Sequence, residues 1–182
     1  LGKAMLLFQI ERLQHSKMIG KLVVATSDDI SDDGIEKICL DNNIEVFRGD
    51  LNNVLDRFYQ CIRIYNPEHV VRLTGDCPLV DWQVVDQVIQ YHLDGNNDYT
   101  SNSLPPTYPD GLDVEVVKSE ALEEAWKKAT LSSEKEHVTY YINQRPNDFQ
   151  IGNFKHSQDL SELRWTVDEP EDFFFVDKVY QD

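Results

Sequence analysis

Two aspartates that each follow a predicted strand are the first residues in this sequence that could carry out chemistry. Asp76 lies in the loop Thr74-Gly-Asp-Cys-Pro78, directly after the predicted strand 69–73. Asp168 opens the acidic run Asp168-Glu-Pro-Glu-Asp172, directly after a second strand-like segment. Carboxylate oxygens suit Mg²⁺, which commonly takes one or two of them together with phosphate oxygens and water. The two aspartates therefore indicate metal-assisted phosphoryl or nucleotidyl transfer.

Each aspartate also has an ordinary structural interpretation. Aspartate is a favoured helix N-cap, so Asp76 and Asp168 could each cap a following helix. Acidic residues in a first helical turn also interact favourably with the helix dipole. Neither segment by itself separates a cap from a metal ligand. Two strand-end aspartates of one sheet can converge across a cleft, and this pairing favours the metal interpretation.

A third acidic group lies around residues 105–115. The loop PPTYPD is closed by Gly111, and a half-exposed strand is expected to follow it. Asp113 and Glu115 share one face of that strand, because side chains alternate with a period of two. Together with Asp110 they could bind sugar hydroxyls or help to hold a metal ion. A solvated acidic strand face is the alternative interpretation for at least one of them.

Cationic side chains supply the candidate binders of phosphate or carboxylate. A guanidinium makes bidentate contacts, so arginines near strand ends are the better candidates, although each could serve an internal ion pair. The histidines lack metal-ligand spacing, and only His137, in Glu136-His-Val-Thr139, stands out. The sequence contains no GxxxxGK[ST] loop, GxGxxG fingerprint or GxSxG elbow. The candidate arginines are Arg48, Arg57 and Arg72.

Alternating helical and strand periodicity gives the elements that must position these residues. Short connections between the two types are typical of parallel βαβ units. We expect one three-layer α/β/α domain over residues 1–182, with a mostly parallel mixed sheet and ligands at the carboxyl ends of its strands. The predicted strands are 21–26, 44–47, 69–73, 112–117 and 163–166. The predicted helices are 5–13, 34–43, 54–65, 82–93, 119–128 with Ser119 as N-cap, 134–143 and 169–180.

Composition excludes several classes of protein. The 182 residues include 17 Lys and Arg against 33 Asp and Glu, a formal net charge of −16. So negative a surface repels nucleic acid and anionic membranes, and no apolar run is long enough to span a bilayer. A small anionic substrate remains compatible where carboxylates hold Mg²⁺. The cysteines are widely spaced and odd in number, which predicts reduced thiols in the cytoplasm: Cys39, Cys61 and Cys77.

Several blocks of the sequence, taken in order, resemble one family. They are VATS (24–27), VFRG (46–49), VLDRF (54–58), VRLTGDCPL (71–79), YPDGLDVE (108–115), EHVT (136–139) and LRWTVDEPEDF (163–173). The chain resembles the cytidylyltransferases of the spore-coat polysaccharide biosynthesis protein F type. These proteins are related to the acylneuraminate and 3-deoxy-manno-octulosonate cytidylyltransferases.

The resemblance implies a nucleotide-diphospho-sugar transferase fold and a reaction of CTP with a sugar acid that gives a CMP-sugar and pyrophosphate, for surface or spore-coat polysaccharide. It implies Mg²⁺ as the cofactor and, by analogy with related enzymes, a homodimer. Asp76 and Asp168 would be the catalytic metal ligands. The nucleotide would contact Thr26, Arg57, Arg72 and Thr74. The sugar would face Asp110, Asp113, Glu115 and His137.

One departure from the family pattern concerns the start of the sequence. The family's first strand and its arginine-, serine- and lysine-bearing phosphate loop are not found, and Leu1-Gly-Lys3 resembles the Gly-Lys that follows that loop. We therefore expect an upstream segment, and weak CTP binding by residues 1–182 without it. Two alternatives stay open: a glycosyltransferase of related fold, and a non-catalytic domain that binds a sugar nucleotide.

Overall fold

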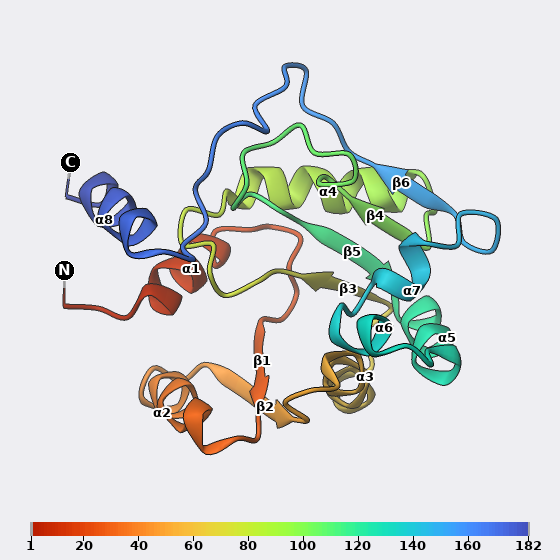
Figure 1. The fold of residues 1–182 in the computed structure, drawn as a ribbon, viewed down its shortest axis with the longest axis horizontal. Helices are drawn as coiled ribbons and strands as arrows, with labels where there is room; N and C mark the ends of the chain where they lie inside the picture. Colours follow the sequence, from red (N-terminus) through yellow and green to blue (C-terminus); the bar gives the residue numbers. More distant parts are fainter. Residues whose placement is uncertain (1, 182) are drawn as a thin grey trace. The chain divides into compact units, whose positions relative to one another are not determined.

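The computed structural model describes residues 2–181, which form two compact units (Figure 1). The first unit comprises residues 20–70 and 117–151. The second takes the chain up to residue 19, residues 71–116 and the chain from residue 152 onward. Each unit has its own buried side chains and is described by itself. The single domain expected over 1–182 stays a prediction.

A parallel pair of strands forms the sheet of the first unit. Strand β1 (Val23–Ser27) pairs with β2 (Glu45–Gly49), with Ala25 opposite Phe47. The 3-10 helix η1 (Ile30–Asp32) and helix α2 (Asp33–Asp41) connect the two strands. This is the βαβ connection that the periodicity predicts, because parallel strands need a crossover between them.

Helix α3 (Val54–Tyr65) has the bounds predicted from the sequence. It begins after Asn53, whose side chain accepts a hydrogen bond from the backbone N–H of Asp56 at 3.1 Å. It ends at Asn66, which takes the left-handed conformation (φ 46°) ahead of Pro67. Asparagine is one of the few residues that adopts this conformation readily, so both ends are determined locally.

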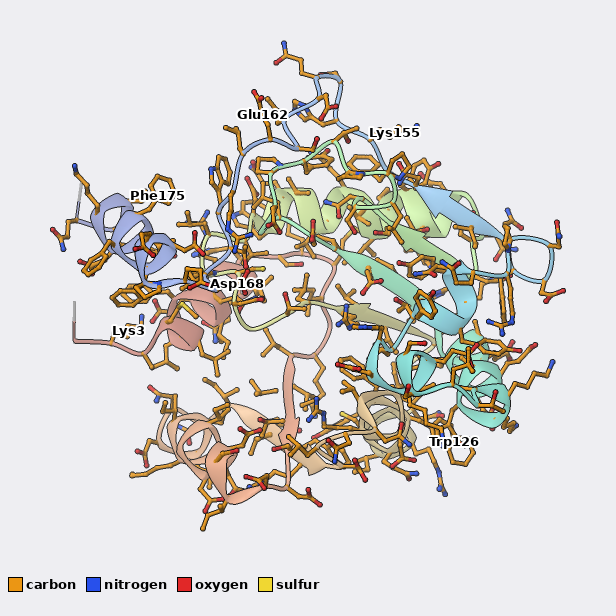
Figure 2. All side chains as sticks on the ribbon, in the orientation of Figure 1. Lys3, Trp126, Lys155, Glu162, Asp168 and Phe175 are labelled. Carbon is orange, nitrogen blue, oxygen red and sulfur yellow. The ribbon has the colours of Figure 1, made fainter. Side chains whose placement is uncertain are left out.

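Helix α5 (Ser119–Lys128) packs against α3. The rings of Tyr59 and Trp126 stack with their centroids 4.0 Å apart, and the Trp126 indole N–H donates to Asp56 at 2.8 Å. Trp126 is labelled in Figure 2. An aromatic pair with a hydrogen-bonded indole therefore joins the two helices.

Two predictions in this unit were wrong in detail. Ser119 is the first helical residue rather than the N-cap, and its hydroxyl donates to the carbonyl of Pro67 at 2.7 Å. The predicted helix 134–143 is two short helices, α6 (Ser132–Glu136) and α7 (Tyr140–Asn143). Between them Val138 and Thr139 are buried, and β-branched residues of this kind favour a helix less.

A sheet in the order β3-β5-β4-β6 belongs mainly to the second unit, and the unit boundary falls within β3, β5 and β6. Helix α4 lies against β4 (Figure 1). The strands of this sheet are β3 (His69–Arg72), β4 (Tyr99–Ser101), β5 (Glu115–Lys118) and β6 (Ile151–Asn153). The helices of the second unit are α1 (Met5–Leu13), α4 (Trp82–Asp94) and α8 (Pro170–Val179). None of the helices described between residues 2 and 181 is long and apolar enough to cross a membrane.

Strands β4 and β6 were not predicted from the sequence. Each has three residues, too few to display an alternating pattern. Strand β4 is buried although it is largely polar, because hydrogen bonds satisfy its side chains. The Thr100 hydroxyl, for example, lies 3.0 Å from His92 Nδ1 and 3.1 Å from Asn97 Nδ2.

The strand predicted at 163–166 is reduced to a single parallel bridge between Asp110 and Arg164. The Asp110 N–H donates to the Leu163 carbonyl at 2.9 Å, and the Trp165 N–H donates to the Asp110 carbonyl at 2.6 Å. The chain then turns at Gly111, where φ is 103°. The parallel pairing stops after this one bridge because the turn at Gly111 directs the backbone away from the segment 163–166.

Gly111 also allows the closest backbone approach in this region. A Cβ atom at this position would lie 2.5 Å from the backbone nitrogen of Thr166 and 2.6 Å from the carbonyl carbon of Trp165. A left-handed conformation and a missing side chain are both required, so no other residue fits without moving the backbone.

We predict that Gly111→Ala lowers the free energy of unfolding by about 2–4 kcal/mol, because it adds backbone strain and a steric clash. Gly34→Ala is the matched control. Gly34 lies in α2, and a Cβ there would meet nothing within 4 Å. The control should be neutral or slightly stabilising in urea unfolding. Equal midpoints for the two variants would contradict the close packing at Gly111.

Candidate functional site

The loop that carries Asp76 lies beside the segment that leads to Asp168. The backbone N–H of Val167 donates to the Asp76 carbonyl at 2.9 Å, and the Thr166 hydroxyl donates to the same oxygen at 3.4 Å. Asp168 is the next residue along the chain. The structure therefore brings the two predicted loops together at the level of the backbone, although only Asp76 follows a formed strand.

The Asp76 side chain does not cap the following helix. Helix α4 is capped by Asp81, whose carboxylate accepts from the Gln83 N–H at 2.8 Å. The carboxylate of Asp76 accepts a weak bond from the Cys77 thiol at 3.3 Å. The capping interpretation of Asp76 is therefore wrong, and the side chain is available for another role.

Gly75 and Cys77 flank Asp76 in this loop. Gly75 has no left-handed backbone, and a Cβ there would meet nothing within 4 Å, so the turn does not depend on a glycine. Cys77 is buried, and burial raises the pKa of its thiol to about 12. Within residues 2–181 the three cysteines are buried and form no disulfide: Cys39, Cys61 and Cys77.

Asp168 is not a helix cap either. The N-cap of α8 is Glu169, and Asp172 completes the capping box. The Asp172 carboxylate accepts from the backbone N–H groups of Asp168 and Glu169, each at 3.0 Å. Asp168 lies at the entry to α8, where Figure 2 labels it. Its own carboxylate instead forms an ion pair with Arg164.

Arg164 contacts three carboxylates at once and was not identified from the sequence. Its Nη1 lies 2.8 Å from Asp110 Oδ2, its Nη2 contacts Asp168, and Nε and Nη2 lie 3.3 and 3.2 Å from Asp172. These bonds raise the pKa of Arg164, and the Arg164 guanidinium lowers the pKa of Asp172 to about 2. The spacing of Arg164, Asp168 and Asp172 by four residues was the signal available in the sequence.

A pocket of about 220 Å³ opens beside the Asp76 loop in the same unit. Four residues predicted from the resemblance line it: Arg72, Thr74, Asp113 and Glu115. Ser103 and Leu104 complete the lining and were not predicted. Asp110 is not among the lining residues, because its carboxylate is directed to Arg164.

The pocket concentrates negative charge around one cation. Arg72 pairs with Glu115, whose other oxygen accepts from the Tyr99 hydroxyl at 2.5 Å. The pKa of Asp113 is raised to about 6, chiefly by burial and further by the carboxylates of Asp110, Glu115 and Asp76. Arg72 therefore forms an internal ion pair, which is one of the two interpretations left open by the sequence. Its position in the pocket lining is also compatible with the other interpretation, the binding of a phosphate or carboxylate group.

Thr26 lies in the first unit, at the carboxyl end of β1. Its hydroxyl donates to Asp32 at 2.7 Å, and the N–H and hydroxyl of Ser27 donate to the same carboxylate at 2.9 and 2.6 Å. These bonds lower the pKa of Asp32 to about 2. Asp32 therefore organises the loop after β1.

Arg57 lies on α3, close to the same strand ends. Among residues 2–181, the buried Nε of its guanidinium has no hydrogen-bond partner. Burial lowers the pKa of Arg57, whereas the nearby carboxylates of Asp32 and Asp50 act to raise it. Its stem packs on Gly49, where a Cβ would lie 3.0 Å from Arg57 Cγ. A cation held this way could bind an anion, as predicted for the nucleotide.

Arg48 and His137 complete the predicted set in this unit. Arg48 is bound to Asp33 and Glu36 at 2.7 and 2.8 Å, so it serves an internal ion pair. His137 is exposed at the end of α6, with its ring 6.3 Å from that of Tyr140. The binding roles of Thr26, Arg57 and His137 stay predictions.

The donor set at Asp76 and Asp168 fits a magnesium ion. Both are carboxylates on adjacent backbone segments, and Mg²⁺ prefers such oxygens together with phosphate and water. Across residues 2–181 no group of three or more His, Cys, Asp or Glu side chains is arranged to hold a metal ion. A two-carboxylate site completed by a nucleotide does not require such a group.

The fold places the chain in a structural class. It is similar to the structure of CMP:2-keto-3-deoxy-manno-octonic acid synthetase complexed with CTP, with a TM-score of 0.71 and 13% identity over 100% of this chain and 89% of that one. It is also similar to a cytidylyltransferase from Leptospira borgpetersenii, with a TM-score of 0.90 and 32% identity over 95% of this chain and 74% of that one. The fold is a mixed α/β nucleotide-diphospho-sugar transferase-like fold, as expected.

Sequence comparison identifies the family. The model of the cytidylyltransferase family matches residues 1–181. The chain is 34% identical to the spore coat polysaccharide biosynthesis protein SpsF of Bacillus subtilis, over 94% of this chain and 73% of that protein. It is 37% identical to an uncharacterized protein of Methanocaldococcus jannaschii, over 90% of this chain and 67% of that protein. The chain belongs to the cytidylyltransferase family, which implies CTP-dependent nucleotidyl transfer.

We predict that Asp32→Asn destabilises the loop after β1 in a pH-dependent way. A carboxylate whose pKa is lowered on folding contributes stability above its unfolded pKa of about 4, and this contribution is lost as the pH falls toward 2. The variant should lose about 1–2 kcal/mol at pH 7 and less at pH 3. Asp41→Asn, in an exposed ion pair with Lys37, is the control. Urea unfolding at both pH values measures the difference, and a constant loss would contradict the charge-based explanation.

Proposed function

We propose that this protein transfers CMP from CTP to a hydroxyl of a sugar acid, giving a CMP-sugar and pyrophosphate. The observation that carries the proposal is the hydrogen bond from the Val167 N–H to the Asp76 carbonyl, which sets Asp76 beside Asp168. Neither carboxylate is used to cap a helix. Two carboxylates on neighbouring loops, neither of them used as a helix cap, suit metal-assisted nucleotidyl transfer.

Asp76 and Asp168 would hold Mg²⁺, which supplies Lewis-acid stabilisation of charge on the α-phosphate and the leaving pyrophosphate. The sugar hydroxyl oxygen forms the new bond to the α-phosphorus as the bond to the β-phosphate bridging oxygen breaks. The hydroxyl proton is released. The task of this chain's residues is to orient the two substrates.

The sugar is assigned to the pocket of Arg72, Thr74, Asp113 and Glu115. The carboxylates and hydroxyls that line this pocket offer hydrogen-bond acceptors and donors suited to a polyhydroxylated ring. The neighbouring Asp110 and Arg164 would border this region. Thr26, Arg57 and His137 remain candidates for the nucleotide and sugar contacts implied by the family.

The similarity to a spore coat polysaccharide biosynthesis protein supports a role in making a surface or spore-coat polysaccharide. A cytoplasmic location and a homodimer belong to the same proposal. Incubation of the protein with CTP, Mg²⁺ and a panel of sugar acids should release pyrophosphate only with the true acceptor. Transfer from a preformed sugar nucleotide, without pyrophosphate release, would instead favour a glycosyltransferase.

We predict that Asp76→Asn reduces turnover about 100- to 1000-fold and leaves folding intact, because a metal ligand is lost and α4 keeps its own cap at Asp81. Asp94→Asn is the matched control. Asp94 lies at the exposed end of α4, where it accepts from the Gln90 side chain. Initial rates of pyrophosphate release and thermal unfolding curves are measured for both. Near-normal turnover in Asp76→Asn would exclude Asp76 as a metal ligand.

A further inference from the structure

The Arg164 guanidinium joins residues from two segments that are distant in the sequence. Asp110 comes from the loop ahead of β5, whereas Asp168 and Asp172 belong to the entry of α8. A guanidinium presents five N–H donors in a rigid planar arrangement, so it can hold several carboxylates in fixed relative orientation. A lysine ammonium at the same position would keep the charge and lose this geometry.

Asp172 binds the Arg164 guanidinium through two of its nitrogens. Its side chain is only 16% exposed, because it also accepts the backbone N–H groups of Asp168 and Glu169 at the start of α8. Asp168 differs, since its side chain is 52% exposed. Within residues 2–181, the only hydrogen bond to its carboxylate comes from Arg164. The orientation of the Asp168 carboxylate therefore depends on Arg164.

We propose that Arg164 is a positioning residue, which orients the Asp168 carboxylate toward the metal ion and links it to Asp110 beside the sugar pocket. This inference rests on the proposed function, because it requires a divalent ion at Asp76 and Asp168. Hydrogen bonds to a ligating carboxylate from outside the coordination shell commonly set its orientation, and their loss weakens metal binding 10- to 100-fold.

The net charge of the cluster around Arg164 is also consistent with the positioning role. One guanidinium against three carboxylates leaves a net charge of −2, so the cluster of Asp110, Arg164, Asp168 and Asp172 still attracts a divalent cation. Without Arg164 the three carboxylates would repel one another and separate. The arginine keeps them close and leaves enough negative charge for the ion.

Arg164→Lys tests the proposal in the full-length protein. Mn²⁺ serves as the probe, because it suits carboxylate ligands and its free and bound forms are distinguished by electron paramagnetic resonance. Titrations are carried out with CTP present and without any sugar, so the readout is affinity rather than turnover. We expect the Mn²⁺ dissociation constant to rise about 10- to 100-fold. The pairs of Arg164 with Asp110 and Asp168 are half-exposed, and lysine keeps the positive charge beside Asp172, so the variant should fold.

Arg145→Lys is the matched control. Arg145 pairs with Glu134 at 2.8 Å, and Glu134 accepts the N–H groups of Thr130 and Leu131 at the start of α6, much as Asp172 does at α8. The same substitution there should leave Mn²⁺ affinity unchanged. Asp110→Asn is the second variant: it removes one contact of Arg164 and leaves Asp168 held, so Mn²⁺ affinity should change less than about fivefold while the KM for the sugar rises.

The outcomes separate this proposal from the proposed function. Mn²⁺ binding by the unchanged protein, together with equal affinity in Arg164→Lys, would overturn the positioning role and support the metal site. A loss of Mn²⁺ affinity in Asp110→Asn or Arg145→Lys as large as that in Arg164→Lys would also overturn the positioning role. The loss would then not be specific to the bond between Arg164 and Asp168. Failure of the unchanged protein to bind Mn²⁺ with CTP would overturn the metal site, and the role of Arg164 with it.

Discussion

The arrangement of the candidate site depends on the backbone hydrogen bond between the Val167 N–H and the Asp76 carbonyl. It joins the loop that follows β3 to the segment that enters α8, although about ninety residues separate them. The approach is permitted by Gly111, where a side chain would collide with Trp165 and Thr166. One close passage of three segments therefore places Asp76, Asp110 and Asp168 in the same neighbourhood.

The helices that follow Asp76 and Asp168 are capped by other acidic residues. Asp81 caps α4, and Glu169 with Asp172 caps α8. Satisfying the free N–H groups at a helix start is a general requirement, and here neighbouring acidic residues meet it. Asp76 and Asp168 consequently keep their carboxylates for other contacts. More than one acidic residue precedes each of these helices, so one of them can cap the helix while another keeps its carboxylate for a different contact.

In the second unit, carboxylates outnumber the arginines that pair with them beside the pocket. Each arginine near the pocket is matched to carboxylates: Arg72 to Glu115, and Arg164 to Asp110, Asp168 and Asp172. Carboxylates nevertheless remain in excess, and burial among them raises the pKa of Asp113 to about 6. Surplus negative charge at one place favours a divalent cation, which in turn attracts phosphate.

The sequence by itself determined the family, the α/β class and the elements with strong periodicity, such as α3 between Asn53 and Asn66, because caps and apolar spacing are local signals. It also identified four of the six residues that line the pocket, since they lie in the blocks shared with the family. Only the tertiary structure decided that Arg164 joins two distant acidic segments and that Asp110 turns away from the pocket. Those pairings arise from a backbone crossing at Gly111, and no local pattern encodes which distant carboxylate an arginine will meet.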